Sequence, residues 1–194
     1  MKRYEYHPYH IQRVQTLLSS DYATRVSFCR TMLEKHQEDP NFFDRILWSD
    51  ESACKRDGYL NLHNIHSWQL ENPHEIREDR SQHQFMVNLW TEIHNGCIIG
   101  PFELPATLNA EIYLDLLQNH LPILLEDVPL ESRRRMWLQQ DGCPAHYGRA
   151  VRAYLDETFA NRLIGRQGPV FWPSRSPDLN PLVFLLGKTN SISR

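Results

Sequence analysis

The stretch Arg45-Ile46-Leu47-Trp48-Ser49-Asp50 decides the fold prediction, because a short apolar run with an aromatic residue ends there on an acid. Such a run predicts a buried β-strand. A second run, Arg135-Met136-Trp137-Leu138-Gln139, leads to another acid, Asp141. The sequence therefore places two aspartates at the ends of two predicted strands.

A helical pattern comes before the first strand. Its apolar residues are Tyr22, Val26, Cys29 and Leu33, at spacings typical of one helix face. Ser20 or Asp21 is available as the N-cap. An amphipathic helix is therefore expected ahead of the sheet.

Two more strands are predicted between the two apolar runs, over residues 59–68 and 85–90. A polar loop, 71–83, separates them, and Asn95-Gly96 marks a turn after the second. The first half of the chain is therefore expected to form a meander of three antiparallel strands.

From residue 105 onward, helical and strand patterns alternate. Asn109 is expected to cap a helix that carries Ile112, Leu116 and Leu117 on one face and that Pro122 kinks or splits. The remaining elements are a strand over 135–139, a helix over 145–159, a strand over 169–172 and a helix over 177–186. Antiparallel strands followed by right-handed crossovers predict an α/β fold, with one mixed five-stranded sheet flanked by helices.

Composition limits the function classes. The chain has 194 residues, of which 41% are hydrophobic, so it suits one globular domain with a sizeable core. A formal net charge of −3 excludes binding of polyanions through overall positive charge. Any such contact must come from local basic sets, which are Arg133 to Arg135, Arg149 with Arg152, and Arg162, Arg166 with Arg175.

The four cysteines contain no Cys-x-x-Cys pair, which argues against a zinc ribbon or a disulfide framework and favours a reducing compartment. The polar start does not resemble a signal peptide. No run approaches the roughly 18 apolar residues of a membrane helix. The chain is expected to be soluble and intracellular, with no membrane partner.

Paired acids at neighbouring strand ends suit phosphoryl transfer. Mg²⁺ takes oxygen ligands, usually one or two carboxylates with waters and substrate phosphates. Two such ions roughly 3.5–4 Å apart can activate the attacking oxygen and stabilise the leaving one. Asp50 and Asp141 are therefore candidate metal ligands. The alternative is that each aspartate only forms a turn or caps a helix.

Residues near these acids are candidates for contact with a nucleic acid. His146 begins the predicted helix after Asp141, and its side chain could face the edge of the sheet that holds the acids or a phosphate. The alternative is a partly exposed histidine at a helix start without such a contact. Trp172 and Arg175 lie in the loop before the last helix, where they could stack on or grip a DNA strand. A structural role for Trp172 is the alternative.

Seven motifs in order resemble the catalytic domain of mariner/Tc1-like transposases. They are Ser49-Asp50-Glu51, His63-Asn64-x-x-x-Trp68, Asn72-Pro73-His74, Ile99-Gly100-Pro101, Gln140-Asp141-Gly142-x-Pro144-Ala145-His146, Ile164-Gly165-Arg166 and Trp172-Pro-Ser-Arg-Ser-Pro-Asp-Leu-Asn-Pro. Together they extend over nearly the whole chain, from about residue 6 to residue 187.

The resemblance implies an RNase H-like fold and Mg²⁺- or Mn²⁺-dependent cleavage and strand transfer of DNA at transposon ends. It gives Asp50 and Asp141 the roles of the first two catalytic, metal-binding acids. It also implies DNA as a partner, a homodimer and a nuclear location. The residues expected to contact DNA are His146, Arg166, Trp172 and Arg175. Residues 1–40 are read as a helical lead-in and 41–194 as the RNase H-like domain.

One departure from the family pattern bears on activity. The third acid should directly follow Pro177-Asp178-Leu179-Asn180-Pro181-Leu182, and Val183 stands there instead. The family does not use the position of Asp178 as its third ligand. The last helix also stops early, so a truncated copy is expected. We therefore expect a transposase-derived domain with impaired catalysis. The alternatives are a non-catalytic nucleic-acid-binding module and an inert transposon remnant.

Overall fold

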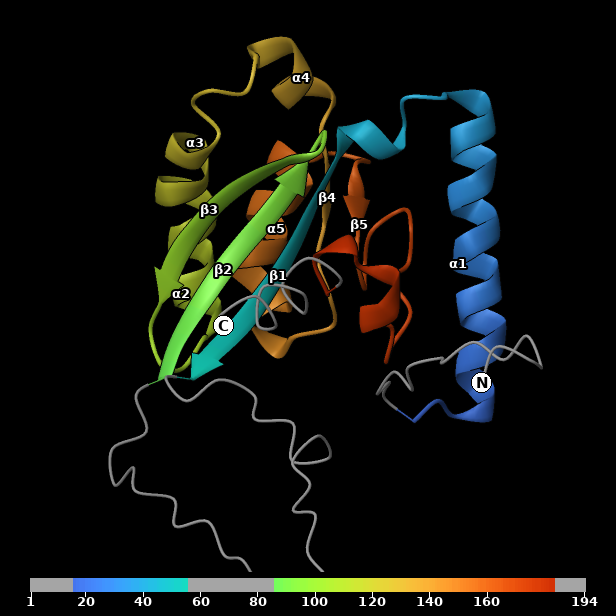
Figure 1. The fold of residues 1–194 in the computed structure, drawn as a ribbon, viewed down its shortest axis with the longest axis horizontal. Helices are drawn as coiled ribbons and strands as arrows, with labels where there is room; N and C mark the ends of the chain where they lie inside the picture. The colour runs from blue at the N-terminus through green and yellow to red at the C-terminus, as the bar shows by residue number, and fades with distance from the viewer. Residues whose placement is uncertain (1–15, 56–85, 184–194) are drawn as a thin grey trace, which may run out of the picture.

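The computed structural model describes residues 16–55 and 86–183. A five-stranded sheet in the order β3-β2-β1-β4-β5 lies at its centre (Figure 1). The strands are β1 (Ile46–Lys55), β2 (Met86–His94), β3 (Cys97–Leu104), β4 (Trp137–Gln139) and β5 (Leu163–Ile164). The pairs β1–β2 and β2–β3 are antiparallel, whereas β1–β4 and β4–β5 are parallel. The predicted mixed sheet is thus confirmed.

The edges of the sheet differ from the prediction. Asn95 and Gly96 form the expected turn, both with positive φ, and β3 follows at once as a strand that was not predicted. Gly100 and Pro101 interrupt its apolar pattern, and an edge strand tolerates both. At the other edge, the strand predicted over 169–172 contributes only a bridge from Val170 to Ile164. The predicted strand 59–68 and loop 71–83 lie outside the described residues.

Helices cover both faces of the sheet. They are α1 (Ser19–Glu38), α2 (Ala110–Asp115), α3 (Leu121–Leu124), α4 (Leu130–Arg135) and α5 (Arg149–Thr158). Asn109 caps α2 as predicted, because its side chain accepts a hydrogen bond from the Ile112 N–H at 2.9 Å. A π-helical turn, Leu116–His120, joins α2 to α3, which has Pro122 in its first turn. None of the described helices combines the length and apolar character needed to cross a bilayer.

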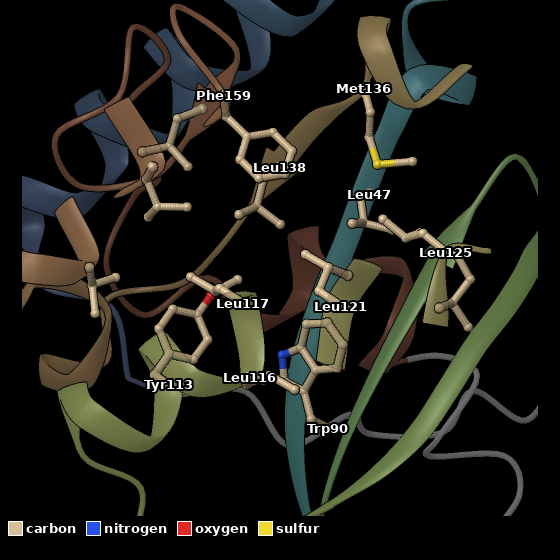
Figure 2. Packing of buried hydrophobic residues seen from close by; sticks show 14 of the residues in the cluster. Leu47, Trp90, Tyr113, Leu116, Leu117, Leu121, Leu125, Met136, Leu138 and Phe159 are labelled. Carbon is tan, nitrogen blue, oxygen red and sulfur yellow. The ribbon is translucent and has the colours of Figure 1, made fainter. Parts of the chain in front are cut away.

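Side-chain alternation along β1 separates two cores. Leu47 belongs to a large core in which Trp90, Tyr113 and Leu117 are buried between the sheet and the helices α2, α3 and α5 (Figure 2). Its neighbour Ile46 belongs to a smaller core on the opposite face, shared with residues of α1 and of the segment after β5. The candidate site, with Asp50 and Asp141, lies just beyond the end of β4.

The helix α1 forms as predicted but turns a different face to the core. Phe28 and Met32 are buried, whereas Tyr22, Val26, Cys29 and Leu33 are exposed. The Phe28 ring packs edge-on against Trp172, with 5.2 Å between ring centroids. Phe28 and Met32 are also one helical turn apart, so the spacing of apolar residues alone could not decide which stripe faces inward.

Candidate metal centre

Asp50 lies on β1, and Asp141 lies two residues beyond the end of β4, at the position that continues the parallel register of the two strands. β1 pairs with β4 at a constant offset of 91 residues, from Ile46 with Trp137 to Trp48 with Gln139, and the same offset separates Asp50 from Asp141. Both aspartates line one cavity of about 270 Å³. The sequence prediction that the two acids lie together is therefore consistent with the geometry.

The prediction that the first strand ends at Asp50 is wrong, because β1 continues to Lys55. Beyond Trp48 the strand loses its partner β4 but keeps its partner β2. Asp50 therefore lies at the point where the sheet opens on one side, rather than at a strand end. This opening gives its carboxyl group access to the cavity.

The other wall of the cavity is the segment after β5, which contributes Trp172 to Pro177 and Asn180. Asn180 anchors this wall, since its Nδ2 donates to the Ser49 carbonyl oxygen at 2.8 Å. The helix predicted over 177–186 is interrupted here. Pro177–Leu179 form a 3-10 turn, and a helical turn resumes over 181–183, where the described residues end.

The surroundings of Asp50 disfavour the charged form of its carboxyl group. Burial raises the pKa of its carboxyl group to about 7, and the nearby charges of Glu51 and Asp141 act in the same direction. Its Oδ1 accepts a hydrogen bond from the Glu51 N–H at 3.0 Å. Burial is thus the main cause of the raised pKa and neighbouring negative charge adds to it, and a bound cation would lower it.

His146 lies between two carboxylates. Its Nε2 is 3.0 Å from Glu51 Oε1, and its Nδ1 is 3.1 Å from Asp141 Oδ1. Burial opposes the charged form of the ring, but the hydrogen bonds to Asp141 and Glu51 outweigh it and raise the His146 pKa to about 10. The two carboxylates therefore favour the protonated form of the ring. Burial alone would raise the pKa of Asp141, but the interaction with His146 helps to hold this pKa below its usual range.

The cluster of Glu51, Asp141 and His146 brings three ligand-type atoms within 4.8 Å of one another. An imidazole binds a metal through a lone pair, but both ring nitrogens of His146 face carboxylate oxygens. The better metal ligands are the remaining oxygens of Asp50 and Asp141, because both residues line the cavity. Such carboxylate oxygens suit Mg²⁺ or Mn²⁺.

The four residues predicted to contact DNA have different surroundings. His146 is 2% exposed, and Trp172 is buried in the smaller core. Arg175 lines the cavity but binds Asp21 through two hydrogen bonds, at 2.6 and 2.7 Å. Arg166 is exposed, and its guanidinium lies 4.9 Å from the centre of the Tyr147 ring. Contact of these residues with a nucleic acid stays a prediction.

Glu51 and Asn180 are structurally important residues that sequence reasoning did not single out. Each lies beside a residue to which the resemblance drew attention, Glu51 next to Asp50 and Asn180 three positions before Val183. Membership of the motifs could have marked them as candidates. Their roles as anchors depend on contacts between distant segments, which no local pattern reveals.

No family model matches the chain, and no curated protein matches it. Solved structures do. The Mos1 transposase paired-end complex with the left transposon end matches with a TM-score of 0.72 and 21% identity, over 98% of this chain and 54% of that chain. The catalytic domain of Mos1 mariner transposase matches with a TM-score of 0.65 and 21% identity, over 94% of this chain and 78% of that one.

The chain has the RNase H-like fold of the Mos1 catalytic domain. The fold that the sequence motifs implied is thereby confirmed. A pre-cleavage Mos1 transpososome also matches, with a TM-score of 0.73 and 19% identity, over 100% of this chain and 56% of that chain. This chain thus spans about half the length of the Mos1 chains in those complexes.

Proposed function

We propose that this chain is a mariner-type transposase catalytic domain that binds DNA and a divalent cation. The observation that carries the proposal is that two carboxylates, Asp50 on β1 and Asp141 two residues after β4, line one cavity. Support comes from Mos1, whose catalytic domain has been solved with Mg and with Mn and whose complexes contain a transposon end.

Asp50 and Asp141 would hold the cation. Each carboxylate has its Oδ1 engaged by a backbone N–H, from Glu51 for Asp50 and from Cys143 for Asp141. Among the described residues, no hydrogen bond donor reaches the Oδ2 of either aspartate, so both oxygens are available. A bound Mg²⁺ or Mn²⁺ supplies charge stabilisation to a phosphate and lowers the pKa of a bound water.

We also infer that DNA cleavage by this chain is impaired. The resemblance places a third carboxylate at Val183, whose side chain offers no ligand atom. Two carboxylates can still hold one cation, but a second cation loses a ligand and a neutralising charge. Each 1.36 kcal/mol of lost transition-state stabilisation slows a reaction about tenfold, so a loss of several kcal/mol slows cleavage by orders of magnitude.

DNA binding without cleavage is the second candidate function. It is favoured by Arg166, an exposed cation whose guanidinium lies over the Tyr147 ring. Tyr147 follows shortly after Gly142, which lines the cavity. Such a module would bind DNA without metal, and its affinity would fall steeply as salt concentration rises. A homodimer and a nuclear location also remain proposals from the resemblance.

Two measurements on the purified chain test these proposals. Calorimetric titration with Mn²⁺ should show binding that is lost in Asp50→Asn and in Asp141→Asn. Incubation with nicked and duplex DNA plus Mn²⁺ should show cleavage that is absent or reduced by orders of magnitude relative to an active mariner transposase. Absence of Mn²⁺ binding by the folded wild type contradicts the metal site. Rapid cleavage that depends on both aspartates contradicts the impairment.

A further inference from the structure

We propose that His146 is a positioning residue that holds Oδ1 of Asp141 inside the protein and thereby turns Oδ2 toward the cavity. The inference rests on the proposed function, in which Asp141 binds the cation. It assigns His146 a role within the protein, in place of direct contact with a phosphate.

Asp141 needs such a device because it lies outside the sheet ladder. β4 ends at Gln139, so the residue is carried by the turn that follows the strand. Its Oδ1 accepts a hydrogen bond from the Cys143 N–H at 2.9 Å, and His146 Nδ1 lies 3.1 Å from the same oxygen and 3.4 Å from the Asp141 carbonyl oxygen. Its side chain is 48% exposed, so without these bonds the carboxylate would be free to rotate.

His146 is itself held from several sides. Its Nε2 contacts Glu51 Oε1 at 3.0 Å, and the Tyr113 ring lies 4.2 Å from the imidazole ring between centroids. The Tyr113 hydroxyl donates to Gln140 Oε1 at 3.0 Å, which fixes the residue before Asp141. The imidazole therefore has one orientation, set by the sheet and by α2.

Glu51 connects the two metal ligands through this arrangement. Its N–H donates to Asp50 Oδ1, and its side chain binds the ring that holds Asp141 Oδ1. The four residues Asp50, Glu51, His146 and Asp141 thus form one continuous path of contacts. A shift of either aspartate relative to the other would have to break at least one of these contacts.

The chemistry of the cluster favours positioning over simple packing. His146 is buried and contacts two carboxylates, and apolar residues of similar size often stabilise a fold as well as such a buried polar cluster or better. Groups that orient metal ligands typically contribute 10- to 100-fold in metal affinity. The orientation of Asp141 is therefore the property that loss of His146 should change most directly.

The test compares Mn²⁺ affinity in His146→Gln, His146→Leu and Glu51→Gln with that of the wild type. A surface histidine–carboxylate pair provides the matched control, because His120 Nε2 lies 3.3 Å from Asp115 Oδ2. We expect the Mn²⁺ Kd to rise about 10- to 100-fold in His146→Leu. His146→Gln keeps one donor and should recover part of that loss, and His120→Gln should match the wild type.

A crystal structure of His146→Gln or His146→Leu adds a measurement that does not depend on metal. A rotated Asp141 carboxylate supports the inference, whereas an unchanged Oδ1 position in both variants overturns it. Unchanged Mn²⁺ affinity in folded His146→Gln and His146→Leu also overturns the inference but leaves the proposed function intact. A wild type that binds no Mn²⁺ overturns the proposed function, and the Asp141 orientation then decides the inference alone.

Discussion

Arg25 of α1 binds Asp178 through two hydrogen bonds, Nη1 to Oδ1 at 3.0 Å and Nη2 to Oδ2 at 2.5 Å. One turn earlier on the helix, Asp21 binds Arg175 of the same loop. These two ion pairs hold α1 against the wall of the cavity. They also engage Asp178, the carboxylate that lies nearest in sequence before Val183, so Asp178 would have to leave Arg25 to bind a metal.

Replacing Asp178 with Asn should therefore lower stability and leave metal binding unchanged. The pair is partly exposed, at 16% and 35% for the two side chains, so we expect a loss of about 1 kcal/mol in the free energy of unfolding by urea. Asp156→Asn is the control, because Asp156 forms an exposed pair with Arg152 on one helix. It should cost about 0.3–0.5 kcal/mol. Loss of Mn²⁺ binding in folded Asp178→Asn would show that Asp178 is a ligand.

If residue 183 is the third ligand position, as proposed, an acid introduced there should improve metal binding. Val183 lies in the helical turn directly after Asn180, which lines the cavity. We expect Val183→Asp to tighten Mn²⁺ binding by about tenfold or more, or about 1.4 kcal/mol, and to increase cleavage of nicked DNA. Val183→Asn has the same shape without the charge and should gain much less. Equal affinities in the wild type and in folded Val183→Asp would argue against a third ligand position there.

The sequence predicted the parts of the site that local pattern and motif order control. Two apolar runs ending near Asp50 and Asp141 indicated two buried strands, and the motifs indicated that these strands are neighbours. In the structure, β1 and β4 pair in parallel at a constant offset of 91 residues, so the two predicted strands are indeed neighbours. The fold followed because strand order and crossovers leave few alternatives.

The remaining features depend on contacts between segments that are far apart in the chain. The buried face of α1 is decided by Trp172 and by the ion pairs to Arg175 and Asp178, not by helical spacing. The burial of His146 likewise depends on Glu51, which is 95 residues away. Local patterns report which residues can face inward, but the partner that arrives from elsewhere decides which of them do.

Metal affinity should depend on pH around neutrality because of Asp50. Burial and neighbouring carboxylates raise its pKa to about 7, so a proton competes with the cation below that pH. We expect the Mn²⁺ Kd to rise by up to about tenfold per pH unit as the pH falls from 7 to 6. A calorimetric series between pH 6 and 8 checks this. An affinity that is constant across the series would contradict the raised pKa.

The same group should affect stability without metal. Because the folded pKa of Asp50 is raised, the protonated form favours folding, so this contribution is complete below about pH 4 and is lost as the pH rises to about 7. Asp50→Asn removes it. Urea unfolding in EDTA should therefore show that the variant gains stability relative to the wild type between pH 5 and pH 8. A difference that does not change with pH would count against this account.

A fully buried acid in β2 should destabilise the fold at alkaline pH. Glu92 is 0% exposed, and among the described residues neither of its carboxylate oxygens has a hydrogen bond partner. Burial alone raises its pKa well above the usual value, so the fold loses stability as the pH rises. Glu92→Leu should raise the free energy of unfolding by about 1–3 kcal/mol at pH 8. The exposed Glu103→Leu serves as control, and an unfolding free energy of Glu92→Leu below that of the wild type would contradict the prediction.

If the chain binds DNA as proposed, the exposed Arg166 should contribute one phosphate contact. Each such contact releases a condensed counterion, so Arg166→Ala should reduce the slope of log K against log salt concentration by about 1. Arg30→Ala on the exposed face of α1 is the control and should leave the slope unchanged. Arg175→Ala should change the slope less than Arg166→Ala, because Arg175 already binds Asp21 in the free protein and DNA would have to compete with that carboxylate. Fluorescence anisotropy at several salt concentrations measures all three slopes. Equal slopes in the wild type and in Arg166→Ala would remove Arg166 from the DNA-binding surface.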